Sequence, residues 1–155
     1  MKRKKQAGLT LIELIVAFTV LLILTSMAVP LARGRVRVER ERDLRAALRE
    51  MYAAIDKYKD YCDVGTFGST KAGTNCWPES LEQLVEGIKV ANSPDGKKIR
   101  LLRKIPRDPF TGKYDWGMRS DQDDPKSMSW GGQNVFAVYT KTYERAPDGK
   151  PYSEW

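Results

Sequence analysis

The chain has 155 residues and a formal net charge of +7, but four of its positive charges lie in the segment Met1–Lys5, so the rest has only a weak basic excess. Those remaining charges are intermixed with acids, and we expect no nucleic-acid partner. Histidine is absent, which removes the commonest general base and metal ligand near neutral pH and favours a chain that is not an enzyme.

A long apolar segment follows the basic N-terminus. From Leu9 to Ala32 the only ionisable side chain is that of Glu13. As a helix with a rise of about 1.5 Å per residue, this segment would reach about 36 Å, enough to cross a bilayer. The positive charge before it favours a cytoplasmic N-terminus, although arginines also follow it. We therefore expect a single membrane-spanning helix.

Glu13 is the unusual residue of this segment, because a carboxylate in a lipid-facing helix costs about 2.5 to 3.5 kcal/mol at the bilayer centre and less near its edge. A carboxylate at this position should have a partner. The alternative is that it only reaches the membrane surface from an inert anchor. A second alternative is a secretory signal peptide cut after Ala28, which would have no evident use for the acid.

The segment Gly8–Leu14, Gly-Leu-Thr-Leu-Ile-Glu-Leu, resembles the type III signal of type IV pilins and type II secretion pseudopilins. The resemblance implies that a prepilin peptidase cuts after Gly8 and methylates the new amino group of Leu9, where the family usually has Phe. Glu13 would then neutralise the N-terminus of a neighbouring subunit during assembly. Pro30 falls where this family often carries a proline.

Past Pro30 the pattern remains helical and becomes amphipathic over residues 33–61. Apolar residues recur at steps of three and four, and they are Leu44, Leu48, Met51, Ile55, Tyr58 and Cys62. We expect this stripe to pack on a soluble domain, and Pro30 to kink or loosen the helix. The sequence thus predicts one helical spine from Leu9 to about Asp60.

Two cysteines follow the stripe. A bond between Cys62 and Cys76 would close a loop of about 15 residues and stabilise the fold by about 3 kcal/mol in a chain-entropy model. Such a bond fits an oxidising compartment and would place this part of the chain outside the cytoplasm. Two unrelated thiols are the alternative.

The remaining sequence predicts a small mixed domain. Trp77–Gly87 has the pattern of a short helix, with Pro78 in its first turn and a glycine at its end. Three segments have strand composition and are separated by turns: Lys98–Leu102, Tyr114–Met118 and Asn134–Tyr143.

The segment Ile105–Tyr114 also resembles the Pro-x-Asp-Pro-aromatic segment of the major pseudopilin of type II secretion. This resemblance implies an α+β type IV pilin-like fold, in which a small domain with a second helix and about three antiparallel strands packs on the long spine. The expected organisation is a cleaved leader at 1–8, a membrane and assembly helix at 9–32, and a periplasmic domain at 33–155.

The same family often holds calcium in an acidic loop near the C-terminus. Here Asp121, Asp123 and Asp124 could begin such a loop, but Pro125 and Lys126 follow where more acidic ligands would be needed. Calcium remains possible, no ligand is assigned, and no other cofactor is expected.

The resemblance implies a structural subunit that polymerises through its N-terminal helix into a type II secretion pseudopilus and drives protein export across the outer membrane. Implied partners are other copies, other pseudopilins, the prepilin peptidase and an inner-membrane assembly platform. Before assembly the chain would cross the inner membrane once, with its C-terminal domain in the periplasm. Alternatives are a major or minor type IV pilin, and a membrane-anchored periplasmic domain whose tryptophans bind a ligand.

Overall fold

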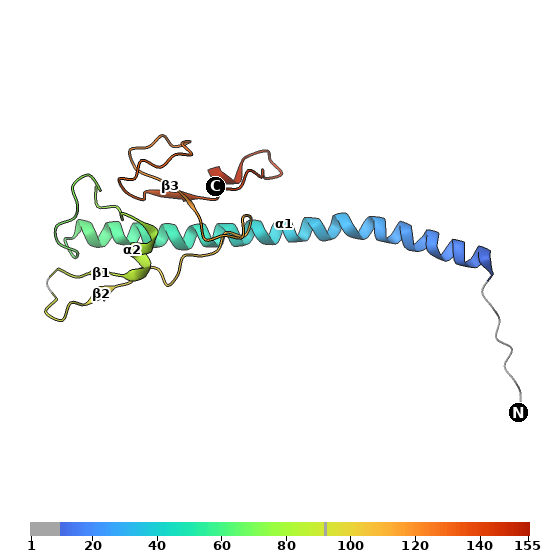
Figure 1. The fold of residues 1–155 in the computed structure, drawn as a ribbon, viewed down its shortest axis with the longest axis horizontal. Helices are drawn as coiled ribbons and strands as arrows, with labels where there is room; N and C mark the ends of the chain where they lie inside the picture. The colour runs from blue at the N-terminus through green and yellow to red at the C-terminus, as the bar shows by residue number, and fades with distance from the viewer. Residues whose placement is uncertain (1–9, 92) are drawn as a thin grey trace, which may run out of the picture. The chain divides into compact units, whose positions relative to one another are not determined.

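The computed structural model describes residues 10–91 and 93–155, without the side chains of residues 27–33. The chain divides into two compact units, residues 1–39 and residues 40–155. Helix α1 (Leu11–Asp63) contributes to both units (Figure 1). The single spine expected from Leu9 to about Asp60 is confirmed from Leu11 onward. The backbone is helical through position 30, and the kink expected at Pro30 stays a prediction.

The core of the second unit is built on the predicted stripe of α1. All six stripe residues are at most 6% exposed, so the expected amphipathic packing is confirmed. They pack with apolar residues from the rest of this unit, among them Leu81, Leu84, Leu102, Trp116, Val135, Val138 and Tyr152. Burying one such large apolar side chain contributes about 1.5 to 3 kcal/mol, so this stripe is a main source of the unit's stability.

The second helix, α2 (Leu81–Glu86), is shorter than the predicted segment Trp77–Gly87. It begins after Ser80, whose side-chain oxygen accepts the backbone N–H of Gln83 at 3.3 Å. This bond satisfies one N–H that the first helical turn leaves free, and it fixes the start of the helix. Gly87, with φ of 91°, ends α2 as expected.

Pro78 therefore does not occupy the first turn of α2, and that expectation was wrong. Its side chain is completely buried, and its carbonyl accepts the backbone N–H of Val135 at 2.7 Å. The neighbouring Trp77 ring meets the ring of Phe136 edge-on, with 5.0 Å between centroids. The segment before α2 thus links the helix to the C-terminal part of the domain.

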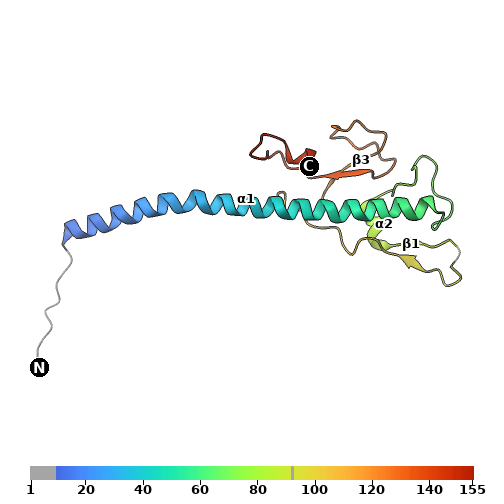
Figure 2. The same cartoon turned by 180° about the vertical axis from the view of Figure 1, so that it is seen from behind.

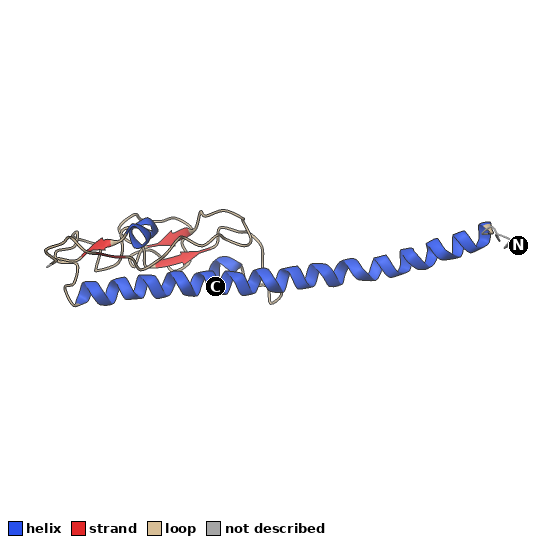
Figure 3. Cartoon of the chain, turned by 90° about the horizontal axis from the view of Figure 1, so that it is seen from below, coloured by secondary structure: helices blue, strands red, loops and turns tan. Residues whose placement is uncertain are grey.

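Four short strands form two antiparallel sheets. One sheet pairs β1 (Ile88–Lys89) with β2 (Lys98–Ile99), and the other pairs β3 (Gly117–Arg119) with β4 (Ala137–Tyr139). In the register of the first sheet Lys89 lies opposite Lys98, and in the second Gly117 lies opposite Tyr139. Within residues 40–155, Figure 3 shows α2 and both sheets over one side of α1, and Figures 1 and 2 show the sheets on its two flanks. The α+β class is confirmed.

The strands differ in number and length from the three predicted segments. The strand expected at Lys98–Leu102 ends at Ile99, because the N–H groups of Leu101 and Leu102 both donate to the carbonyl of Leu84. β1 was not predicted, because a pair of residues has no readable alternation.

β4 begins three residues later than the start of the predicted strand Asn134–Tyr143. Val135 N–H donates to Pro78, and the N–H of Phe136 donates to the carbonyl of Arg119 at 2.9 Å. The Phe136 bond reaches the last residue of β3, whereas Val135 bonds to the segment before α2, so the ladder does not extend to Asn134.

The segment that carries the second resemblance, Ile105–Tyr114, contains a turn that is organised by the side chain of Asp108. Its carboxylate is completely buried; Oδ1 accepts the N–H of Phe110 at 2.8 Å, and Oδ2 accepts the hydroxyl of Thr140 at 2.6 Å. The Asp108 N–H donates to the carbonyl of Lys113 at 2.8 Å. One side chain thus shapes its own turn and ties it to the residue after β4.

The C-terminus packs against α1 within the second unit. Tyr152, in the 3-10 helix η1 (Tyr152–Glu154), is completely buried, and its hydroxyl donates to Glu41 Oε1 at 2.6 Å. Its ring lies 4.3 Å from that of Phe110, between centroids. The guanidinium of Arg45 lies 4.1 Å from the centroid of the Trp155 ring. These contacts close the core at the end of the chain.

Candidate functional site

Glu13 lies in the first turn of α1. Its backbone N–H donates to the hydroxyl of Thr10 at 3.4 Å, and the Leu14 N–H donates to the carbonyl of Thr10 at 3.2 Å. Thr10 therefore caps the helix, in the Thr-x-x-Glu spacing of a capping box. The sequence carried this signal, and our sequence interpretation of Glu13 missed it. An acid in the first turn is also favoured by the positive end of the helix dipole.

The apolar side chains around Glu13 are exposed on every side of the helix. Each large apolar residue from Leu11 to Leu24 is at least 45% exposed, and Leu11 reaches 81%. The hydroxyls of Thr25 and Ser26 donate to carbonyls of the preceding turn, at 2.9 and 2.8 Å. These two hydroxyls are thus bonded to the backbone of their own helix, and the apolar surface of this part of α1 is left uncovered.

Within the described part of the chain, none of the helices has both the length and the apolar character of a membrane span.

The structure describes only some of the residues predicted for processing and assembly. Gly8 and Leu9 lie outside the described residues, and so does the side chain of Pro30. Of this predicted set, only Glu13 has a described side chain. The roles assigned to these four residues therefore stay predictions.

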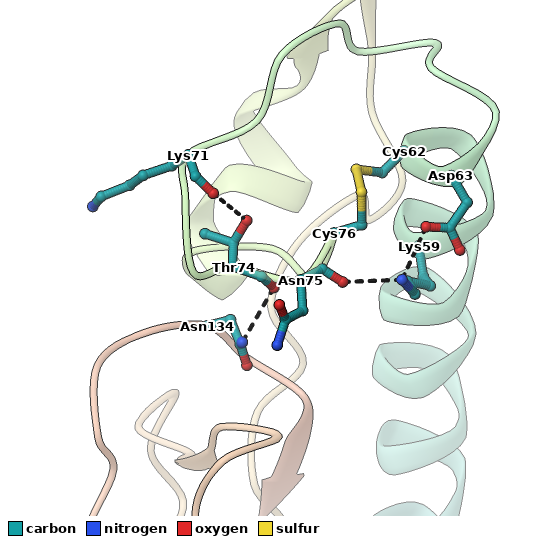
Figure 4. The surroundings of a disulfide bond; sticks show 8 residues. All are labelled: Lys59, Cys62, Asp63, Lys71, Thr74, Asn75, Cys76 and Asn134. Carbon is teal, nitrogen blue, oxygen red and sulfur yellow. Dashed lines mark hydrogen bonds and ion pairs between the residues drawn. A yellow bond between two sulfur atoms is a disulfide. The ribbon is translucent and has the colours of Figure 1, made fainter.

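The predicted disulfide is present (Figure 4). Cys62, near the end of α1, is bonded to Cys76, with 5.6 Å between their Cα atoms and a separation of 14 residues. One turn earlier in α1, Lys59 Nζ donates to Asp63 Oδ1 and to the carbonyl of Asn75, each at 2.9 Å. The segment before Cys76 is thus fixed to α1 by a covalent bond and a charged hydrogen bond.

The backbone at this junction is left-handed. Asn75 and Cys76 have φ angles of 51° and 61°, and among the described residues other than glycine they alone have positive φ. Asparagine tolerates this conformation, whereas it is unfavourable for most side chains with a Cβ, so surrounding contacts must hold it.

Asn75 and Asn134 meet at the carboxylate of Asp121. Asn75 Nδ2 donates to Asp121 Oδ2 at 2.7 Å, and Asn134 Nδ2 donates to Asp121 Oδ1 at 2.8 Å. Asn134 Nδ2 also donates to the carbonyl of Thr74 at 3.2 Å, as Figure 4 shows. Burial acts to raise the pKa of Asp121, but hydrogen bonds from Asn134, Asn75 and Ser120 outweigh it, so the pKa is lowered.

The acids considered for calcium do not form an oxygen cage. Asp121 faces two amide N–H groups, and Asp123 Oδ2 accepts the backbone N–H groups of Ser120 and Gly131 at 2.7 and 3.1 Å. Asp124 Oδ1 accepts the Lys126 N–H at 2.8 Å. The described residues bring together no group of three or more His, Cys, Asp or Glu side chains that could hold a metal. Calcium takes six to eight oxygen ligands, and these N–H donors do not fit it.

Comparisons with known proteins give a match to the N-terminal signal and matches to most of the chain. Residues 3–29 match the family model described as the prokaryotic N-terminal methylation motif. The chain is 32% identical to type II secretion system core protein G of Pseudomonas aeruginosa over 119 residues, which cover 75% of this chain and 76% of that protein. It is 28% identical to the protein of the same name from Aeromonas hydrophila over 120 residues, or 74% of each chain.

No solved structure matches the chain significantly. The match to the Pseudomonas aeruginosa protein extends well past the leader and covers three quarters of both chains. The helical spine with its small antiparallel sheets is the fold that the resemblance implied. The chain therefore belongs to the family of type II secretion system core protein G, the major pseudopilins with a type IV pilin-like fold.

Proposed function

We propose that this chain is a structural subunit of a type II secretion pseudopilus, which polymerises through its N-terminal helix and drives protein export across the outer membrane. The observation that carries the proposal is the uncovered apolar surface of residues 11–24 in a chain whose relatives are core protein G. In this role the chain catalyses no reaction of its own.

Processing would create the assembly-competent form. A prepilin peptidase cuts after Gly8 and methylates the amino group of Leu9, and the matched methylation motif at residues 3–29 supports this step. The cut removes the basic leader 1–8 and leaves one ammonium group at the start of the apolar segment. Intact mass or N-terminal sequencing should show a chain that starts at methylated Leu9, whereas a start at Val29 would indicate an ordinary signal peptide.

Before assembly, the segment 9–32 would anchor the chain in the inner membrane, with the leader in the cytoplasm and residues 33–155 in the periplasm. The Cys62–Cys76 disulfide supports this orientation, because such bonds persist in oxidising compartments. An inner-membrane assembly platform would then move the subunit into a periplasmic filament with other copies and other pseudopilins.

Glu13 would pair with the methylated ammonium of a neighbouring Leu9. Within residues 10–91 and 93–155 no hydrogen bond or ion pair reaches its carboxylate, although its backbone N–H is capped by Thr10. Coulomb attraction between opposite charges strengthens as the surroundings lose water, so a pair inside a filament core would be strong. Removing one member would leave the other buried without a partner, which is destabilising.

The test replaces Glu13 with Gln, which keeps the size of the side chain and removes its charge. We expect membrane insertion, measured by alkaline extraction, to be unchanged, and filament formation, measured by electron microscopy and cross-linking, to be strongly reduced. Thr10→Ala is the matched control, because it removes the cap and keeps the charge. Normal filaments from Glu13→Gln would contradict the charge pair, and equal loss in both variants would assign the effect to the helix start.

A type IV pilin subunit remains the nearest alternative, because the leader would be shared. The relatives named core protein G, which match about three quarters of the chain, favour secretion. Deletion of the gene should therefore abolish export of a secreted protein and leave surface pili intact. Loss of pili with normal export would favour the alternative.

A further inference from the structure

The loop at residues 120–134 is joined to the segment before Cys76 by side-chain amides. The two oxygens of the Asp121 carboxylate each accept an N–H, one from Asn75 at 2.7 Å and one from Asn134 at 2.8 Å. We name these three side chains the amide clasp. Asp121 lies 46 residues after Asn75 and 13 residues before Asn134 in the sequence.

The orientation of the Asn134 amide is fixed by backbone groups. Its Oδ1 accepts the N–H of Asp121 at 3.2 Å, and its Nδ2 donates to the carbonyl of Thr74 at 3.2 Å. A backbone N–H can only donate and a carbonyl can only accept, so the amide cannot be turned around. Its donor end therefore faces the Asp121 carboxylate.

The disulfide holds the other arm of the clasp. Asn75 and Cys76 have left-handed backbone, which contacts must maintain. The bond from Cys76 to Cys62 ties this backbone to α1, and Lys59 Nζ holds the carbonyl of Asn75 at 2.9 Å (Figure 4). The position of the Asn75 amide thus depends on the covalent link.

We propose that the amide clasp, anchored by the Cys62–Cys76 disulfide, closes the loop 120–134 without a divalent cation, so that oxidation of two thiols takes the structural role that calcium would have there. Two amide donors and the Ser120 hydroxyl, in place of a metal ion, compensate the Asp121 carboxylate. The loop of this chain is therefore sensitive to thiol reduction and insensitive to calcium.

Closure of the clasp requires one oxidation step. The thiols of Cys62 and Cys76 lose two protons and two electrons as the Sγ–Sγ bond forms. A disulfide-carrying oxidant accepts them by thiol–disulfide exchange and leaves as its dithiol.

The first test measures thermal unfolding of the oxidised full-length chain in detergent, with a calcium chelator or with about 10 mM Ca²⁺, roughly ten times the weakest dissociation constant of extracellular calcium modules. A site of that affinity would raise Tm by about 3 to 6 °C. We expect a change below about 1 °C, which is within the reach of nonspecific salt effects. A rise of the size calculated for a calcium site would overturn the proposal.

The second test measures trypsin cleavage after Lys126, an exposed residue of the loop, with the products identified by mass spectrometry. Dithiothreitol should increase the cleavage rate at Lys126 by about tenfold or more, since cleavage follows the population of the open loop. Cleavage after Lys98, in β2, should change little and is the control for global unfolding. An unchanged rate at Lys126 after complete reduction would refute the anchoring role of the disulfide.

Two variants at Asn75 separate the clasp from the disulfide. Asn75→Gly keeps the left-handed backbone accessible and removes the amide, so Lys126 should be cleaved faster although the disulfide is intact. Asn75→Asp places a second carboxylate opposite Asp121, so its Tm should fall in chelator and rise on addition of Ca²⁺. If both variants match the wild type in every condition, the amide clasp does not hold the loop.

Discussion

Replacement of Asp108 with Ala should destabilise the second unit strongly. The carboxylate is completely buried and accepts hydrogen bonds from Phe110 N–H and from the Thr140 hydroxyl, which is itself completely buried. The substitution leaves both donors without acceptors. Each unsatisfied buried group costs about 1 to 3 kcal/mol, so the unfolding free energy should fall by about 2 to 6 kcal/mol.

Urea unfolding of the full-length chain, followed by tryptophan fluorescence, measures this loss. Trp116 is a suitable reporter because it is 3% exposed and its indole donates to the carbonyl of Pro106, two residues before Asp108. In a thermal scan the same loss should lower Tm by roughly 4 to 24 °C, at about 2 to 4 °C per kcal/mol for a chain of this size.

Three further variants separate the two hydrogen bonds of the Asp108 carboxylate. Asp108→Asn keeps an oxygen for the turn and should cost only about 1 kcal/mol, while Thr140→Val removes one donor and leaves the turn intact. The double variant Asp108→Ala with Thr140→Val should show a coupling of about 1 kcal/mol or more between the two sites. A loss within about 0.5 kcal/mol of zero for Asp108→Ala, which is typical of surface sites, would refute the structural role of this carboxylate.

The remaining predictions concern four other contacts. The double variant Cys62→Ser with Cys76→Ser should lower the unfolding free energy by about 3 kcal/mol in chemical denaturation, and an unchanged midpoint would contradict this. Gly117→Ala should cost about 1 to 3 kcal/mol, because a Cβ there would lie 2.2 Å from the Tyr139 ring, whereas Gly34→Ala, with nothing within 4 Å, is the control and should not destabilise. Tyr152→Phe should cost about 1 kcal/mol by loss of the hydrogen bond to Glu41. The lowered pKa of Asp121 predicts a stabilising contribution that is complete above about pH 5 and is lost as pH falls through the lowered pKa, so the stability difference between wild type and Asp121→Asn should shrink in acid. A difference that grows on acidification would contradict this sign.

The long helical spine could be predicted because a helix that packs on a core places an apolar residue toward that core at every turn. Leu44, Met51 and Ile55 follow this pattern: each faces the core, and each is 0% exposed to solvent. The disulfide could be proposed because the chain has only two cysteines, and residues 62 and 76 close a short loop. Both features depend on local spacing, which a sequence displays directly.

Strand ends and the amide clasp could not be predicted, because distant backbone groups decide them. Leu101 and Leu102 have the composition of a strand, but their N–H groups bind the carbonyl of Leu84. Asn75 lies in a polar loop and Asn134 at the start of a predicted strand, and neither position indicates a shared partner. Asp121 joins them only when the fold brings these segments together. The sequence alone assigned no role to Asp121, because its hydrogen-bond donors come from distant parts of the chain.

The two parts of α1 differ in how their apolar side chains are covered. This difference explains why Glu13 is central to the proposed function. From residue 40 onward, the apolar stripe of the helix is covered by the chain's own core. Between Leu11 and Leu24, apolar side chains face outward on every side, while the hydroxyls of the same helix bond to its own carbonyls. Such a surface suits lipid before assembly and neighbouring apolar helices afterwards. Neither environment supplies a partner for the Glu13 carboxylate, and in the proposed function a cation brought by a neighbouring subunit would stabilise it.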